Sequence, residues 1–582
     1  MKTSLLLSGQ PESVTDETWL KVIADTNAVM DDLVSHIGGY PSLGSSFNTP
    51  SFDPLWLTYH RILKSWTSPG SKTEEEMDVE ARNQWLGDDW AKPLYLDMVG
   101  LPERQRRVLI QARVKLNLWL KSLKFNFHDF DITSGETFTS AKGKTSVYQK
   151  LKDLRYWTVT ADAADLACRL IYNNRGFREC ARKHLIHVTT KEERKELSRS
   201  IPHSRNKGFT CFSMLAKKHL LTIVLGSRLE TVPKDSDKRR TINVEPWFNV
   251  LLQRILGLSI RQVLSGVGND LEKGQEDHKR LIANKTYATI DLRNASNSNL
   301  VAAVRWLLDP RTFSLLTSCR SEYCTYDGDD WHLTAMFSCM GNGFTFELMT
   351  AILLAVSRTL DPTSRVYGDD IIIKNRHAAF FIELLECLQW EVNEDKTFIQ
   401  SSFRESCGAF YHDLHGYLLS YKFKRCESIE DCIIVANKLY MLRNQSALLR
   451  GAHLRVQSLF PAMHWGPVPF YKDNLGCYVW ADKAGSGNSR LPVTLKHDLR
   501  KVIKNDYQVE NFTTFYGVEK LPILASPTLA VVKKGNVFKK HFYLFNARRS
   551  PDVIRNEYVE RFVLFVSFQG HPHRVKGIMF KQ

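Results

Sequence analysis

The segment SRVYGDDIIIKN, residues 364–375, carries the strongest structural signal in the chain. Two adjacent carboxylates, Asp369 and Asp370, follow a β-prone pair and precede three isoleucines. This pattern predicts two short strands joined by a tight turn at Gly368. Paired charges among isoleucines cost desolvation free energy unless a cation offsets it. The segment therefore predicts a hairpin that presents carboxylates to a metal ion.

A second source of carboxylate lies in TYATIDLRNASNSN, residues 286–299. Its β-prone start predicts a strand over residues 286–292 that carries Asp291 near its end. Magnesium sites for phosphoryl transfer take carboxylates from more than one segment. If this strand lies beside the hairpin, Asp291 and Asp369 could bridge two cations about 4 Å apart. Taken alone, Asp291 is better explained as a helix cap.

The tripeptide Gly-Asp-Asp also occurs in CTYDGDDWHL, residues 324–333. Here an Asp-Gly pair stands between two β-prone runs, which is the usual chemistry of a hairpin turn. We therefore expect Asp329 and Asp330 to be solvated turn residues without a metal.

The composition excludes several classes of protein. The chain has 582 residues, of which 43% are hydrophobic and 24% charged, so a largely disordered or low-complexity protein is excluded. Its 79 Lys and Arg against 63 Asp and Glu give a net charge of +16, which favours a polyanionic partner. Eleven cysteines without a C-x-x-C pair argue against a disulfide framework and predict a reducing compartment. No apolar run approaches the roughly 20 residues of a membrane span, and the first residues carry too short an apolar run for a signal peptide, so we expect a soluble protein.

Helical and β-prone segments are mixed without a regular βαβ order, which predicts an α+β fold. Helices are expected over residues 246–265, 343–358 and 376–389, and residues 159–217 are expected to be mostly helical. A further helix over 294–316 should break near Pro310. Near the end of the chain we expect a hairpin at 533–540 and a strand at 561–568.

Five motifs in one order resemble a known family: TIDLRNASNS, FSCMGNGFTFEL, VYGDDIII, KTF and FRESCG. They resemble the replicase subunits of the positive-strand RNA bacteriophages, the RNA-directed RNA polymerases of the Qβ-like and MS2-like leviviruses. The basic stretch VPKDSDKRRTINVEP, residues 232–246, resembles the segment that precedes the palm in that family. Together these stretches cover roughly residues 230–415. Ordered motifs are far more specific than YGDD alone.

The resemblance implies a right-hand polymerase with fingers, palm and thumb. Residues 1–245 would form the N-terminal region and fingers, including the basic segment 232–246 that binds nucleoside triphosphate. Residues 246–425 would form a palm of antiparallel sheet with packed helices. Residues 426–582 would form the thumb and C-terminal region.

The resemblance also assigns the metal ligands. Asp291 and Asp369 would be the main ligands of two Mg²⁺ ions, for which Mn²⁺ can substitute, and Asp370 would support them. Lys396 would be the general acid for the pyrophosphate leaving group. An exposed lysine near a strand is an equally good explanation of Lys396.

The substrate-binding residues implied by the resemblance come from three segments. Two cations of the basic segment would bind the triphosphate. Asn297 stands where relatives carry aspartate, and its amide can still hydrogen-bond a ribose 2′-hydroxyl. Residues of the glycine-rich motif would contact template or ribose, and its first glycine would let the backbone approach a nucleotide. The full set is Lys234, Arg240, Asn297, Ser338, Gly341, Asn342 and Thr345.

The predicted function is template-directed RNA synthesis from nucleoside triphosphates, with release of pyrophosphate, in the cytoplasm of an infected bacterium. The expected partners are template and product RNA and, by resemblance, host elongation factors Tu and Ts and a ribosomal protein. One alternative is a reverse transcriptase, which also uses a palm with paired aspartates. Another is a non-catalytic basic RNA-binding protein, whose salt-sensitive binding would survive loss of Asp369.

Overall fold

A computed structural model describes most of the first 460 residues and five short strands beyond them. The described residues are 16–38, 52–66, 72–93, 95–127, 136–139, 150–151, 153–200, 206–234, 238–326, 328–460, 465–466, 479–480, 527–534, 539–545 and 563–568. The chain divides into two compact units. The first comprises Met1–Met77, Pro233–Arg239 and Tyr417–Lys496, and the second comprises the rest. The division into fingers, palm and thumb stays a prediction.

A helical region opens the second unit. Its helices are α3 (Glu74–Trp90), which begins in the first unit, α4 (Glu103–Leu120), α6 (Ala164–Asn173), α7 (Arg175–Val188), α8 (Lys191–Ser200) and α9 (Lys207–His219), with a 3₁₀ turn η1 (Leu154–Tyr156). Strand β1 (Thr158–Thr160) precedes α6 in the sequence and β2 (Thr222–Val224) follows α9, and the two strands pair in parallel. The prediction that 159–217 is mostly helical is confirmed.

Two strand pairs form a four-stranded sheet with the order β4-β3-β7-β8. Its members are β3 (Gly226–Pro233), β4 (Arg239–Val244), β7 (Tyr323–Thr325) and β8 (Trp331–Leu333). Strands β7 and β8 are antiparallel, with Thr325 opposite Trp331. Gly328 in their turn has a φ of 99°, and Asp329 and Asp330 are exposed. The first Gly-Asp-Asp is therefore the hairpin turn that was predicted.

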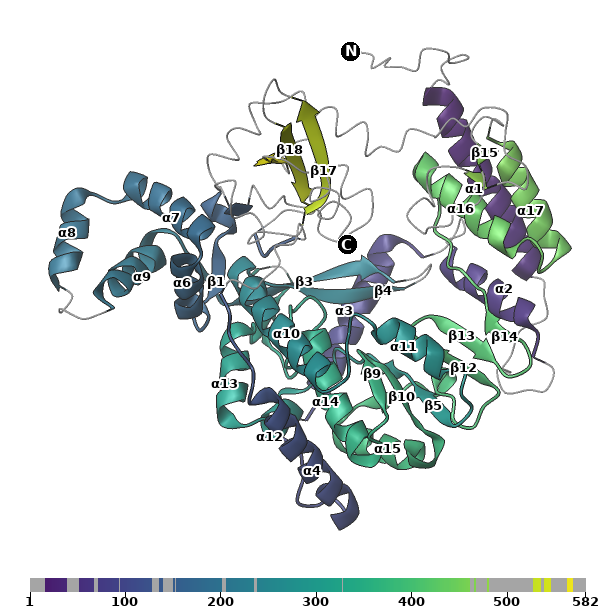
Figure 1. Cartoon of the computed structure of the whole chain (residues 1–582), viewed down its shortest axis with the longest axis horizontal. Helices are drawn as coiled ribbons and strands as arrows, with labels where there is room; N and C mark the ends of the chain where they lie inside the picture. Colours follow the sequence, from purple (N-terminus) through teal and green to yellow (C-terminus); the bar gives the residue numbers. More distant parts are fainter. Residues whose placement is uncertain are drawn as a thin grey trace. The chain divides into compact units, whose positions relative to one another are not determined.

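The second Gly-Asp-Asp lies in a three-stranded antiparallel sheet with the order β5-β10-β9. Its strands are β5 (Tyr287–Ile290), β9 (Arg365–Tyr367) and β10 (Asp370–Lys374). The three isoleucines of β10 are fully buried. Against this sheet lie α11 (Gly274–Leu281), α14 (Thr345–Leu360) and α15 (Asn375–Cys387), and α10 (Trp247–Gly266) packs against α14 (Figure 1). The predicted helices 246–265, 343–358 and 376–389 correspond to α10, α14 and α15.

Shorter elements complete this part of the second unit. They are β6 (Leu292–Arg293), which pairs with β11 (Glu391–Val392), the helices α12 (Val301–Leu307) and α13 (Pro310–Cys319), the 3₁₀ turn η2 (Glu394–Lys396), and the antiparallel pair β12 (Phe403–Ser406) and β13 (Ala409–His412). The predicted break near Pro310 is confirmed. Asp309 caps α13 by accepting the N–H groups of Arg311 and Thr312 at 3.0 and 3.2 Å, and proline takes the first helical position.

Four helices make up most of what the structure describes of the first unit. These are α1 (Asp16–Gly38), α2 (Pro54–Ser65), α16 (Ile429–Leu442) and α17 (Ala447–Ser458), with the short parallel pair β15 (Trp465–Gly466) and β16 (Val479–Trp480), and β14 (Gly416–Leu418) where the chain enters this unit. Asp31 of α1 accepts the Trp66 indole N–H and an N–H of Arg425, each at 2.8 Å. These bonds tie α1 to the segments that follow α2 and precede α16.

The last described strands form an antiparallel meander. They are β17 (Pro527–Lys534), β18 (Lys539–Phe545) and β19 (Val563–Phe568), with the order β17-β18-β19. The predicted hairpin at 533–540 and the late strand are confirmed. The mixed helices and sheets confirm the α+β class. Among the described helices, none is both long and apolar enough to cross a membrane.

Asn249 of α10 is a buried polar link within the core of the second unit. Its amide oxygen accepts the Thr160 N–H at 2.9 Å, and its amide nitrogen donates to Thr160 Oγ1 at 2.8 Å and to the Cys319 carbonyl at 3.1 Å. One side chain thereby joins α10 to β1 and to the end of α13.

Replacing Asn249 should destabilise the second unit. Asn249→Ala leaves the Thr160 N–H buried without an acceptor, so we expect the free energy of unfolding to fall by about 2–4 kcal/mol. Denaturant unfolding followed by circular dichroism measures it. Asn173→Ala is the control, because Asn173 is exposed and donates to the Arg169 carbonyl of its own helix. Equal free energies of unfolding for the two variants would contradict the role of Asn249 as a stabilising polar link.

Candidate active site

Pairing of β5 with β10 brings the three predicted carboxylates to one end of the sheet. Ile290 lies opposite Ile371, so Asp291 follows β5 at the end where Asp370 begins β10. Asp369 lies in the turn between Tyr367 and Asp370, which face each other in register. The predicted juxtaposition of the strand carrying Asp291 with the hairpin is confirmed.

Gly368 makes this tight turn possible. Its φ of 64° lies in the left-handed region, and a Cβ there would lie 2.4 Å from Cε2 of Phe346. Its N–H donates to Thr350 Oγ1 at 3.0 Å, which fastens the turn to α14. The turn is therefore held close against the helix, and a side chain at this position would force Phe346 to shift.

Asp291 is held by the segment around η2. Asn393 Nδ2 donates to Asp291 Oδ2 at 2.7 Å, and Lys396 Nζ lies 3.7 Å from the same oxygen. The backbone N–H of Asp291 donates to Thr397 Oγ1 at 3.3 Å. The structure therefore places Lys396 beside Asp291, and its role as a general acid stays a prediction.

The three carboxylates repel one another in a partly buried setting. Burial, followed by the charge of Asp291, raises the pKa of Asp369 above its ordinary value, against the opposing effects of Lys396 and Arg240. Burial raises the pKa of Asp370 to about 7, and Asp369, Asp291 and Glu405 add to the shift. The neighbouring cations thus offset only part of the negative charge.

This donor set fits a divalent cation that also binds substrate. Among the described residues, no three His, Cys, Asp or Glu side chains surround one point as metal ligands. Magnesium, however, is usually held by one or two carboxylates, with water and substrate phosphates as the other ligands. The uncompensated charge of Asp291, Asp369 and Asp370 is of the kind that such a cation offsets.

The two neighbouring cations differ in their surroundings. Burial acts to lower the pKa of Lys396, but Asp291, with Glu405, Asp370 and Asp369, raises it above the ordinary value. Lys396 is therefore charged at neutral pH, and 45% of its side chain is exposed. Arg240, at the start of β4, is exposed, and its Nη1 lies 3.8 Å from Met340 Sδ in the glycine-rich loop.

The side chains of the glycine-rich loop that precedes α14 bond mostly within the protein. Ser338 Oγ accepts the Asn299 amide at 3.0 Å, and Thr345 Oγ1 donates to the Cys339 carbonyl at 2.8 Å. Asn342 is buried, and its amide oxygen accepts the Phe344 N–H at 3.0 Å. In this structure these side chains shape the loop, and their contact with template or ribose stays a prediction.

Gly341 joins the glycine-rich loop to β4. Its φ is 107°, and a Cβ would lie 2.1 Å from the Asn243 carbonyl oxygen. The Asn243 N–H donates to the neighbouring Met340 carbonyl at 2.7 Å. The close approach at this glycine is therefore to the backbone of β4.

The two remaining predicted residues lie in different places. Asn297 is half-buried in a turn after β6, where its N–H donates to the Asn294 carbonyl at 2.8 Å. Lys234 belongs to the first unit, so its role as a triphosphate ligand stays a prediction.

Sequence reasoning missed some residues that hold the carboxylates. Asn393 and Thr397 lie on either side of Lys396 in the sequence. The motif KTF includes Thr397, but it did not show that Thr397 contacts Asp291. Ser406, inside the motif FRESCG, donates to Asp370 Oδ1 at 3.3 Å. No sequence signal indicated His278, whose Nδ1 lies 2.8 Å from Ser406 Oγ.

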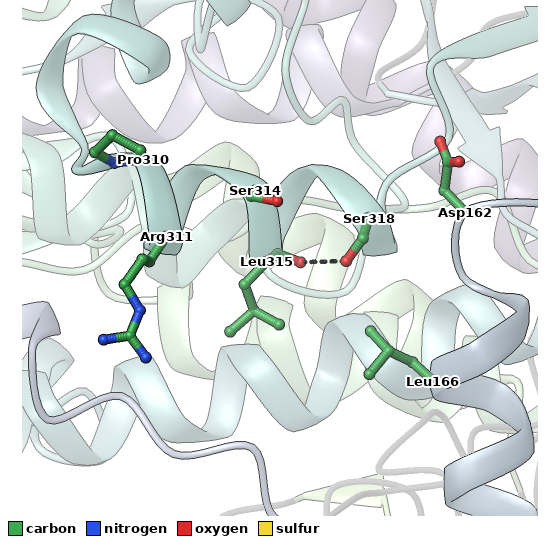
Figure 2. A pocket seen from close by; sticks show the side chains of 7 residues that line it. All are labelled: Asp162, Leu166, Pro310, Arg311, Ser314, Leu315 and Ser318. Atoms are coloured by element: carbon green, nitrogen blue, oxygen red, sulfur yellow. Dashed lines mark hydrogen bonds between the residues drawn. The ribbon is translucent and has the colours of Figure 1, made fainter.

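A shallow cavity lies away from the predicted site residues, beside α13 and the start of α6. Its volume is about 530 Å³, and Arg311, Ser314 and Asp162 are among the residues that line it (Figure 2). The Ser318 hydroxyl donates to the Leu315 carbonyl of its own helix at 2.9 Å, as Figure 2 shows. The cavity contains none of the three carboxylates, so it is not the candidate active site.

Comparison with known proteins agrees with the motifs. Residues 178–459 match the family model described as RNA replicase, beta-chain. The chain is 34% identical over 225 residues to the RNA-directed RNA polymerase beta chain of Enterobacteria phage GA, covering 37% of this chain and 42% of that one. It is 38% identical over 202 residues to the corresponding chain of Escherichia phage MS2, covering 33% and 36%. The aligned stretch spans less than half the length of these curated relatives. Residues 178–459 are thus similar to the RNA replicase beta-chain family, and the predicted resemblance is confirmed.

Likeness to solved structures is weaker. The RNA-dependent RNA polymerase of bacteriophage phi12 aligns with a TM-score of 0.37 and 11% identity, over 75% of this chain and 76% of that one. A likeness at this level supports no argument about the site.

Gly341 and Gly328 offer a matched test of the glycine-rich loop. Both have φ near 100°, but a Cβ at Gly328 would meet no atom within 4 Å. We expect Gly341→Ala to lower the free energy of unfolding by at least about 3 kcal/mol, and Gly328→Ala by about 1–2 kcal/mol, because only the first adds a backbone clash to the strain. Thermal and denaturant unfolding measure both. Similar values for the two variants would show that the loop is not held against β4.

Proposed function

We propose that the chain is the catalytic beta subunit of a positive-strand RNA phage replicase, an RNA-directed RNA polymerase. The observation that carries this proposal is the convergence of Asp291, Asp369 and Asp370 at one end of the β5-β10-β9 sheet, with Lys396 and Arg240 as neighbouring cations. Names of the similar proteins support the same reaction. The reaction would be nucleotidyl transfer from nucleoside triphosphates, directed by an RNA template.

In this mechanism Asp291 and Asp369 would hold two Mg²⁺ ions, with Asp370 in support. When bound, the ions would lower the pKa of the attacking 3′-hydroxyl and stabilise negative charge on the departing pyrophosphate. Arg240 would attract the triphosphate. Lys396, charged at neutral pH, would donate a proton to the pyrophosphate or stabilise its charge. Asn393 would orient Asp291 through its 2.7 Å hydrogen bond.

The setting of this activity follows from the same resemblance. The substrates would be template RNA and nucleoside triphosphates, and the net charge of +16 suits such polyanions. A relative is named as subunit beta, which supports action within a larger assembly. We propose host elongation factors Tu and Ts and a ribosomal protein as the other components, and the cytoplasm of the infected bacterium as the location.

Removal of one carboxylate tests the proposal directly. Asp369→Asn should lower incorporation of labelled nucleoside triphosphates on an RNA template at least about 100-fold, because it removes a charged metal ligand. RNA binding measured by filter retention should stay near that of the parent, since phosphate contacts provide most of that affinity. Activity within a few-fold of the parent would contradict the metal assignment.

The control for this variant is the other Gly-Asp-Asp. A double variant, Asp329→Asn with Asp330→Asn, changes the same residue types in the exposed β7–β8 turn. Its activity should be close to that of the parent, because surface substitutions usually change stability by no more than about 0.5 kcal/mol. Loss of synthesis in this variant but not in Asp369→Asn would show that the wrong aspartate pair was assigned.

Sugar selection provides a second test, at Asn297. Its amide can hydrogen-bond a ribose 2′-hydroxyl, and a deoxyribose would leave that amide without a partner. Asn297→Ala should therefore reduce the preference for ATP over dATP about 5–30-fold, and Asn297→Asp should keep it. The measurement is the ratio of kcat/KM for the two nucleotides on one RNA template. An unchanged ratio in the alanine variant would assign selection to other residues, and a parent that prefers dATP would favour a reverse transcriptase.

A further inference from the structure

A buried histidine lies behind the carboxylates, outside the proposed mechanism. His278, on α11, is 1% exposed, and its Nδ1 lies 2.8 Å from Ser406 Oγ. Ser406 ends β12, is also 1% exposed, and its hydroxyl lies 3.3 Å from Asp370 Oδ1. His278, Ser406 and Asp370, from three separate elements, are thus connected by two successive hydrogen-bond contacts, and the last of them is a candidate metal ligand.

The direction of the hydrogens in these contacts follows from the donors and acceptors available. An Asp370 that holds a cation is ionised and can only accept, so in the 3.3 Å contact the Ser406 hydroxyl is the donor. Cys407 Sγ, 4.0 Å from Ser406 Oγ, is a weaker acceptor than the carboxylate. The Ser406 oxygen is then left as the acceptor for an N–H at His278 Nδ1.

The surroundings of His278 favour the same tautomer. Burial, with a contribution from Arg365, lowers the pKa of His278 to about 3, so the ring is neutral and carries one N–H. Nε2 is buried, and the described residues give it no hydrogen-bond partner. Placing the hydrogen on Nδ1 satisfies Ser406 and leaves only a lone pair at Nε2. The opposite tautomer would bury an unbonded N–H at Nε2, and Nδ1 could then be satisfied only if the Ser406 hydroxyl turned its hydrogen away from Asp370.

We propose that His278 is a positioning residue which, through the hydroxyl of Ser406, directs a hydrogen bond at Asp370 and so orients that carboxylate toward the divalent cation. The inference deepens the proposed function and rests on it. Groups behind metal ligands commonly set ligand orientation and affinity in this way. This orienting effect depends on the N–H of His278. The His278 ring also packs against Tyr367, with 6.3 Å between the ring centroids, and that packing is a separate contribution.

Two replacements separate the N–H from the packing. His278→Leu keeps apolar volume but removes the donor, whereas His278→Asn places an amide N–H near the position of Nδ1. His412→Leu is the matched control, since His412 is also buried, lies on the neighbouring strand β13, and accepts the Leu414 N–H at 3.2 Å. Ser406→Ala removes the middle group of the three.

The experiment measures Mn²⁺ binding to the full-length protein by electron paramagnetic resonance, without RNA or nucleotide. We expect His278→Leu and Ser406→Ala to raise the Kd for Mn²⁺ about 10-fold, and His278→Asn and His412→Leu to change it less than about 3-fold. Nucleotide incorporation measured against Mg²⁺ concentration should rank the variants in the same order. The half-saturating Mg²⁺ concentration should rise in His278→Leu and Ser406→Ala. Melting temperatures report the packing cost, which both leucine variants should share.

Each outcome bears on one of the two proposals. Asp369→Asn should weaken Mn²⁺ binding; if it does not, the metal assignment of the proposed function is wrong, and the role of His278 falls with it. If Asp369→Asn weakens binding while His278→Leu binds as the parent does, only the role of His278 is overturned. Should His278→Leu not fold, Ser406→Ala decides, and a parent-like Kd in that variant overturns the proposal.

Discussion

Pairing of β5 with β10 is the interaction on which the candidate site depends. Its register places Ile290 opposite Ile371, and this brings Asp291 to the end of the sheet that bears the Gly368 turn. Ile371, Ile372 and Ile373 alternate between the two faces of the sheet and are all buried, so both faces of β10 pack against the protein. Packing on both faces of β10 therefore holds the carboxylates in place, even though their mutual repulsion opposes the arrangement.

That repulsion is the source of the proposed chemistry. Isoleucine side chains, Thr350 and Phe346 hold the turn in place while the carboxylates remain short of positive charge. The folding free energy of the surrounding core thus maintains a local arrangement that is unfavourable by itself. A cation relieves the repulsion when it binds, which explains how a structural constraint can become a binding site.

Two identical tripeptides show how context decides function. At 328–330 the turn is exposed, and a Cβ on Gly328 would meet open space. At 368–370 the turn is packed against α14, and a Cβ on Gly368 would collide with Phe346. The flanking residues already distinguished them, because a Trp-His pair follows the first and three isoleucines follow the second. Burial of the second turn follows from that difference in flanking hydrophobicity.

The sequence by itself determined the α+β class, the hairpin at Gly368, the strand that leads to Asp291 and the family resemblance, because periodicity and ordered motifs are local properties. It could not show that Asn393 donates to Asp291, or that His278 contacts Ser406 next to Asp370. Each of these two contacts joins residues about 100 or more positions apart. Nor could the sequence show that Gly341 approaches β4 rather than a nucleotide. Such contacts exist only once packing of the core has fixed which distant segments meet, and no local pattern encodes that choice.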